Sequence, residues 1–105
     1  MRWYSKLYIG DTMKKDWETA RKILEAGQAP SGVYLLCLPV NPEERMDIIP
    51  AFVLEQTGDA FREWEILGLA KGRKEAFSLA GDLMRDVYEK TGAFDVRAFV
   101  EGQMK

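Results

Sequence analysis

The chain has 105 residues, which is enough for one domain with its own core. Its composition, 47% hydrophobic and 30% charged, is typical of a folded globular protein and excludes a largely disordered chain. The net charge of −2 excludes binding of nucleic acid through an overall basic excess, so no nucleic-acid partner is expected. With no histidine and one cysteine, the sequence has no Ser-His or Cys-His pair, and we expect no catalytic residue, metal site or cofactor.

The N-terminal segment from Met1 to Gly10 lacks the continuous apolar core of a secretory signal. No apolar stretch approaches the 18 or more residues of a membrane span. We therefore expect a cytoplasmic protein without a membrane partner.

The first elements are a short strand over Lys6–Ile9 and a helix from Asp11 or Thr12 to about Ala26, with Gly27 just after its end. The helix is supported by a narrow apolar stripe at helical spacing. Its members are Met13, Trp17, Ala20 and Leu24.

Residues Val33 to Leu38 predict a strand that is apolar on both faces, ended by Pro39. Cys37 lies inside this run, where a thiol usually behaves as a small buried hydrophobic group. We expect it to be buried and unreactive.

The middle and end of the chain predict one short helix, two strands and one long helix. Residues 49–55 suit a short helix with Pro50 in its first turn, and residues 57–59 a turn. Residues 64–70 predict a second strand apolar on both faces, followed by a helix from about Arg73 to Lys90. The alternation of apolar residues from Phe94 to Val100 predicts a last strand.

These elements predict a single α+β domain over residues 1–105, with a three- or four-stranded sheet and two main helices. If the first strand forms, the order matches the split βαβ, ferredoxin-like arrangement, in which one sheet face has no helix. The strands over 33–38 and 66–70 are apolar on both faces, so something must cover that second face. The candidates are residues 43–62 and a second copy of the chain, and the latter predicts a homodimer.

The junction between the second confident strand and the long helix is the candidate ligand site. It carries Lys71, Gly72, Arg73 and Lys74, and the first turn of a helix offers unpaired N–H groups and a positive dipole end. These features predict a site for a small anion or a phosphorylated metabolite. The alternative is that Gly72 shapes a turn and the charges are solvated.

Other groups give weaker signals. Acidic residues gather at Glu43, Glu44 and Asp47 and again at Asp59, Glu63 and Glu65, a pattern more typical of solvated loops than of paired catalytic carboxylates. Ser78 lacks a nucleophile-elbow motif and a base. Trp3, Tyr4 and Tyr8 crowd the N-terminus, and such a cluster packs on the domain or on a partner more often than it stacks on bases.

Three blocks of sequence resemble a family of small proteins of unknown function from anaerobic gut Firmicutes. They are Asn41-Pro42 through Asp47-Ile-Ile-Pro50 with Leu54-Glu-Gln56, Gly68-Leu-Ala-Lys-Gly72 with Glu75-Ala76, and Lys90-Thr-Gly92 with Phe94-Asp-Val-Arg97. The resemblance runs from about Lys6 to Phe99 and implies an intact domain. It brings no activity, ligand or functional residue with it.

The sequence thus favours a non-catalytic module that self-associates or senses a ligand. The alternative is a binder of a small anion at residues 71–75. An enzyme of unknown class is the remote third hypothesis, because no nucleophile–base pair is present.

Overall fold

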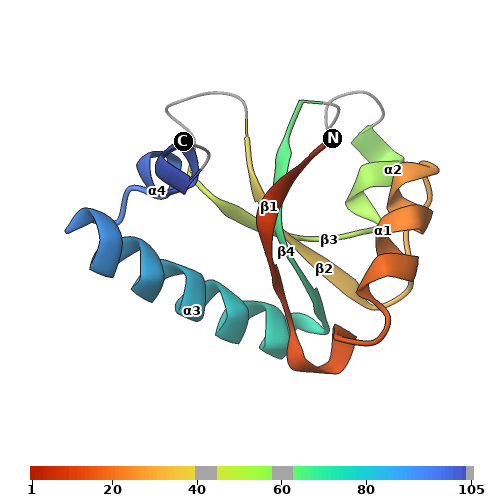
Figure 1. The fold of residues 1–105 in the computed structure, drawn as a ribbon. Coiled ribbons are helices and arrows are strands. Elements are labelled where there is room, and N and C mark those ends of the chain that lie inside the picture. Colours follow the sequence, from red (N-terminus) through yellow and green to blue (C-terminus); the bar gives the residue numbers. More distant parts are fainter. Residues whose placement is uncertain (40–44, 58–62, 104–105) are drawn as a thin grey trace.

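The computed structural model describes residues 1–39, 45–57 and 63–103 and shows a four-stranded mixed sheet between two layers of helices (Figure 1). The strands are β1 (Arg2–Ile9), β2 (Val33–Leu38), β3 (Asp47–Pro50) and β4 (Glu65–Lys71). The helices are the 3₁₀ helix η1 (Asp11–Met13), α1 (Trp17–Glu25), α2 (Val53–Thr57), α3 (Arg73–Thr91) and α4 (Val96–Gln103). The predicted α+β class is confirmed.

The strand order across the sheet is β1-β4-β2-β3. β1 pairs with β4 in parallel, whereas β4 with β2 and β2 with β3 are antiparallel. The two central strands, β4 and β2, are the two that the sequence marks as apolar on both faces. Except for half-buried Glu65 and Tyr34 and exposed Lys71, their residues are buried.

Helices α3 and α4 cover one face of the sheet (Figure 1). α3 contributes a stripe of five buried residues, Ala76, Leu79, Ala80, Leu83 and Val87. α4 adds Val96, Phe99 and Val100 to the same core. This core includes every second residue of β2, such as Leu36 and Leu38, as the alternation of a strand requires.

The opposite face is covered by η1, α1 and the segment that leads into α2 (Figure 1). Met13, Ala20 and Leu24 of the predicted helical stripe lie in this second core, with Trp17 packed against it. Ala51 is buried there and Leu54 packs against it. Both faces are therefore covered within one chain, in part by residues from the candidate segment 43–62.

The ends of several elements differ from the sequence-based prediction. β1 begins at Arg2 rather than Lys6, and the helix predicted from residue 11 to 26 is divided into η1 and α1. Gly27 has φ 83°, as its position after the helix end predicted. The predicted short helix over 49–55 is wrong in its first half, because Asp47–Pro50 forms the edge strand β3 and α2 starts only at Val53. The predicted turn at 57–59 lies in part outside the described residues.

The predicted last strand over 94–100 is wrong, because this segment forms α4. The Asp95 carboxylate accepts a hydrogen bond from the Ala98 N–H (3.1 Å), which caps the helix start. Val96, Phe99 and Val100 also follow helical spacing, so the segment fits both periods. The contacts of this segment with α3 favour the helix over the strand.

Residues 2–71 run β-α-β-β-α-β, the element order of the split βαβ arrangement, but with β3 and α2 in place of the elements that the sequence predicted. The layers differ from those expected of that arrangement. Helices lie on both faces, since α3 and α4 follow β4 and return across the face opposite α1.

The edge strand β1 follows β4 irregularly. Trp3 lies opposite Ile66 and Tyr8 opposite Gly68, so five steps along β1 match two along β4. A Cβ atom on Gly68 would lie 2.9 Å from the Tyr8 carbonyl oxygen, which is why glycine occupies this close approach. An irregular edge of this kind discourages pairing with another strand.

The predicted burial of Cys37 is confirmed, since its side chain is fully buried. Burial, with a smaller effect of the Asp47 carboxylate, raises the pKa of the thiol to about 12. The group is therefore a protonated thiol at neutral pH.

We expect a thiol reagent to label Cys37 slowly in the native protein and quickly in the protein unfolded by guanidinium. Fast labelling of the native protein would contradict the burial of β2.

Candidate functional site

The four residues of the predicted anion site lie where β4 ends and α3 begins. Gly72 precedes the first helical residue with φ 82° and ψ 155°, a conformation that favours glycine. Lys71, Arg73 and Lys74 are exposed around it. The Arg73 guanidinium lies over the Phe77 ring, 5.5 Å from its centre, so the Arg73 side chain follows the outer side of α3.

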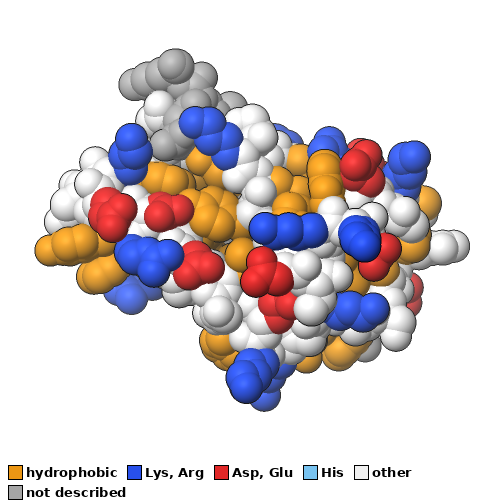
Figure 2. Space-filling view, turned by 60° about the horizontal axis from the view of Figure 1, so that its bottom comes forward, with side chains coloured by type: hydrophobic (Ala, Val, Ile, Leu, Met, Phe, Trp, Pro, Cys, Tyr) orange, Lys and Arg blue, Asp and Glu red, His pale blue; other side chains and the backbone are white. Residues whose placement is uncertain are grey.

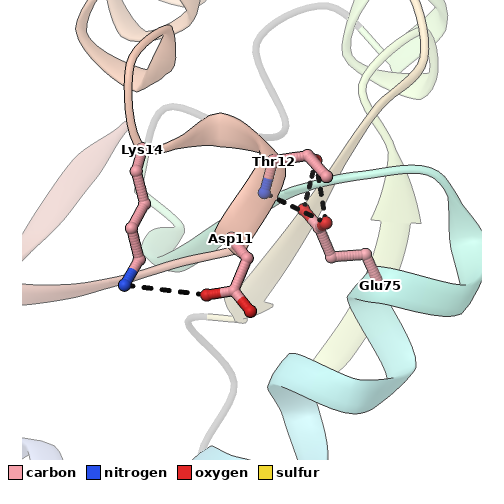
Figure 3. A network of polar contacts seen from close by, with 4 residues as sticks. All are labelled: Asp11, Thr12, Lys14 and Glu75. Carbon is pink, nitrogen blue, oxygen red and sulfur yellow. Dashed lines mark hydrogen bonds and ion pairs between the residues drawn. The ribbon is translucent and has the colours of Figure 1, made fainter.

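A carboxylate of the chain itself lies at this helix start (Figure 3). Glu75 accepts hydrogen bonds from the Lys71 N–H (2.9 Å) and from the Thr12 hydroxyl (2.7 and 2.9 Å to its two oxygens). The Thr12 N–H is a further donor at 3.3 Å. Glu75 thus joins the end of β4 to η1, which follows β1.

Gly10 makes room for this contact. A Cβ atom at this position would lie 2.0 Å from a Glu75 carboxylate oxygen, so any larger residue would displace the carboxylate. We refer to Gly10, Thr12, Lys71 and Glu75 as the Glu75 clasp. The sequence analysis did not identify it, although an acidic residue three positions after a helix cap is a known signal.

Burial raises the pKa of Glu75, whereas the hydrogen bonds from Lys71 and Thr12 lower it. The hydrogen bonds together have the larger effect, so the pKa lies below its ordinary value. The carboxylate is therefore charged at neutral pH, and it lies beside the positive end of the α3 dipole while it accepts the Lys71 N–H at the end of β4. An external anion would bind beside this carboxylate. The anion site at Lys71, Gly72, Arg73 and Lys74 stays a prediction, now with an internal competitor.

A cleft of about 610 Å³ lies between β1 and α3. Charged side chains of both signs line it. The acidic ones are Asp11, Glu75, Asp82, Asp86 and Glu89, and the basic ones are Lys6, Lys14, Arg85 and Lys90. Figure 2 shows this face of the molecule, where acidic and basic groups alternate around hydrophobic patches. A lining of this kind suits a ligand that carries both charges rather than a simple anion.

Two tyrosines of β1 line the same cleft. The Tyr8 hydroxyl donates a hydrogen bond to the Asp86 carboxylate of α3, and burial, followed by this bond, raises its pKa. The Tyr4 side chain is 3% exposed, and its hydroxyl has no partner among the described residues. Its pKa is raised by burial and then by Glu65 and Asp86, so the group is a protonated donor at neutral pH. Trp3, which the sequence grouped with them, packs on the opposite face under Arg21.

The outer side of α3 carries a second feature that the sequence analysis did not identify. Phe77 and Tyr88 are 54% and 53% exposed, and Phe94, 66% exposed, contacts the Tyr88 ring at 5.1 Å between centroids. Phe77, Gly81, Met84 and Tyr88 follow heptad spacing on one side of the helix.

Only some of the acidic residues noted in the sequence lie in the part of the chain that the structure describes. Glu43, Glu44 and Asp59 lie outside the described residues, and Asp47 lies exposed on β3, where its carboxylate accepts the Ile48 N–H at 2.9 Å. Across the described ranges no three Cys, Asp or Glu side chains come close enough to hold a metal ion. Ser78 lies on α3 at the side of the cleft.

Comparison with protein-family models, curated proteins and solved structures found no match. The resemblance to the Firmicutes family therefore stays a prediction from sequence. Among residues 1–39, 45–57 and 63–103, no helix combines the length and apolar character needed to cross a membrane.

The Glu75 clasp predicts a pH-dependent contribution to stability. Because the pKa of Glu75 is lowered in the folded state, its stabilisation is present above the unfolded pKa of about 4.3 and is lost as the pH falls through the folded value. We expect Glu75→Gln to lower the free energy of unfolding by about 1 kcal/mol at pH 7, discounted for partial exposure. The difference from the native protein should shrink below pH 4 in urea titrations. Glu101→Gln, an exposed acidic position on α4, is the control and should change little. An equal loss in both variants, or no change with pH, would contradict the clasp.

The anion prediction is tested by thermal unfolding in phosphate and in chloride at matched ionic strength. A site at residues 71–74 that is saturated at 100 times its dissociation constant would stabilise the protein by about 2.7 kcal/mol. We expect Arg73→Ala with Lys74→Ala to abolish any gain specific to phosphate. Lys15→Ala with Lys22→Ala, which removes the same charge elsewhere, should retain it. Equal shifts in all three proteins would show that the junction binds no anion.

Proposed function

We propose that the protein is a non-catalytic interaction module that self-associates. The sequence-based reason, an uncovered second sheet face, no longer applies, because α1 and the segment before α2 cover that face. The proposal now rests on a different observation, the exposed apolar strip on the outer side of α3. This strip consists of Phe77, Met84, Tyr88 and Phe94, and we call it the α3 strip.

The α3 strip supports association because its residues are large and apolar and follow the outer side of α3, with Phe94 placed against Tyr88 just after the helix end. Phe77, Tyr88 and Phe94 are each more than half exposed, whereas Tyr4 and Phe99 on the same side of the sheet are buried. Single exposed apolar residues are ordinary on a protein surface, but an aligned group of them is typical of an interface. β1, the longer free edge of the sheet, is irregular and less suited to strand pairing.

A ligand-sensing role is the second candidate, and the Tyr4 hydroxyl favours it. A buried hydroxyl without a partner among the described residues is uncommon, and Tyr4 is one of the residues that line the cleft between β1 and α3. A ligand with an acceptor atom in that cleft would satisfy it. The mixed charges of the lining favour a small zwitterion, such as a free amino acid, over the anion predicted at the junction.

Self-association predicts a mass that depends on concentration. Sedimentation equilibrium of the native chain from low micromolar to submillimolar concentration should move from the chain mass towards twice that mass. Phe77→Ser with Tyr88→Ser should stay at the chain mass, because both side chains point away from the core and their loss leaves the fold intact. The matched control, Phe52→Ser, removes a 56% exposed aromatic near α2 and should associate like the native chain. A single chain mass for the native protein throughout this range would overturn the proposal.

A further inference from the structure

We propose that the cleft between β1 and α3 binds a short peptide through its free N-terminus. The Tyr4 hydroxyl donates to the first carbonyl oxygen of the peptide, and Glu89 binds its terminal ammonium group. This inference rests on the ligand-sensing role, the second candidate function, and narrows the zwitterionic ligand to a peptide. It does not depend on self-association.

The Tyr4 side chain supplies a donor that the chain itself leaves unused. Tyr4 lines the cleft, its side chain is 3% exposed, and its hydroxyl has no hydrogen-bond partner among the described residues. Tyr8, on the same strand, shows the usual arrangement, since its hydroxyl donates to the Asp86 carboxylate. Because buried hydroxyl groups are nearly always paired in native proteins, the partner of Tyr4 is best supplied by a ligand.

The surroundings of the Tyr4 hydroxyl select a neutral acceptor. Burial is the main cause of its raised pKa, and the carboxylates of Glu65 and Asp86 add to it. Asp86 also lines the cleft, so the hydroxyl lies within the influence of a carboxylate on the cleft side. Two carboxylates therefore already act on this hydroxyl, and they would repel an anionic acceptor. An amide carbonyl accepts the bond without that repulsion.

Glu89 is the second group of the cleft that the chain leaves unused. It is exposed on α3 and has no ion pair or hydrogen bond among the described residues. The other carboxylates of the lining each have a partner in the chain, namely Lys14 for Asp11, Thr12 for Glu75, Arg85 for Asp82 and Tyr8 for Asp86. An ammonium group is the complement of the remaining carboxylate.

A free peptide N-terminus carries both complements next to each other. Its ammonium group is followed, one carbon further on, by a neutral amide carbonyl. A free amino acid has a carboxylate in that place, which the carboxylates near Tyr4 disfavour. Lys6 and Lys90 belong to the same lining and complement the C-terminal carboxylate of the peptide.

The size of the cleft agrees with a ligand of this class. Its volume of about 610 Å³ lies within the range of small-molecule sites, about 300–1,000 Å³, and suits roughly two or three peptide residues. Leu79 and Phe99 are among the apolar residues of the lining. Since the Tyr4 hydroxyl is shielded from water, a ligand that reaches it displaces a lining side chain, and the bond then forms without competing solvent.

Isothermal titration calorimetry with trialanine tests the class of ligand. We expect the native chain to bind trialanine at millimolar concentration. N-acetyl-trialanine, which lacks the ammonium group, and free alanine, which lacks the amide carbonyl, should bind roughly tenfold more weakly. Equal binding of the acetylated peptide would overturn the role of the N-terminus. If alanine binds and trialanine does not, ligand sensing stands and the peptide class is wrong. No binding of either compound would overturn both.

Tyr4→Phe separates a ligand contact from a structural role. It should weaken trialanine binding roughly tenfold without lowering the midpoint of thermal unfolding, because no bond within the chain is lost. Tyr34→Phe, at a partly buried tyrosine outside the cleft lining, is the matched control and should bind like the native chain. Native affinity in Tyr4→Phe, or a lowered unfolding midpoint, would overturn the assignment of its hydroxyl.

Glu89→Gln should also weaken trialanine binding roughly tenfold, whereas Glu18→Gln, an exposed position on α1, should not. Native affinity in Glu89→Gln would overturn the ammonium site. Phe77→Ser with Tyr88→Ser should bind trialanine like the native chain, because neither residue lines the cleft. Loss of binding in that variant would show that the site requires self-association and would contradict a cleft that acts within one chain.

Discussion

The burial of β2 and β4 on both of their faces is the constraint on which the rest of this structure depends. Two adjacent strands without a solvated face cannot stand at the surface of a small protein, so helices have to cover the sheet from both sides. The chain achieves this by sending η1 and α1 to one face and α3 with α4 to the other. Every candidate site described above lies at the margins that this layering leaves open.

The most exposed of those margins is the edge strand β1. Its irregular pairing with β4 leaves a cleft against α3, and polar contacts hold the two sides of the cleft in place. The Glu75 clasp fixes one end, and the bond from Tyr8 to Asp86 ties the strand to the middle of the helix. The helix start that the sequence marked for an external anion thus serves, first of all, to attach β1 and η1 to α3.

The outer side of α3 is the other margin, and it differs in kind. Its aromatic residues Phe77 and Tyr88 contribute little to the folded chain, because each is more than half exposed. Gly81 even weakens the helix where no neighbour demands it. Features that cost stability without a structural return inside the chain are explained most simply by a contact outside it.

The sequence by itself determined the α+β class, the two buried strands, the start of α3 directly after Gly72 and the burial of Cys37, because these depend on local periodicity and on glycine conformation. It could not determine that residues 94–100 form a helix or that Asp47–Pro50 forms a strand. Both segments are short and fit either period, and their contacts with α3 and β2 decide the outcome. The partnership of Glu75 with Thr12 and Gly10 joins residues more than 60 positions apart. Only the tertiary structure brings such residues together, since no local pattern records which distant atoms will meet.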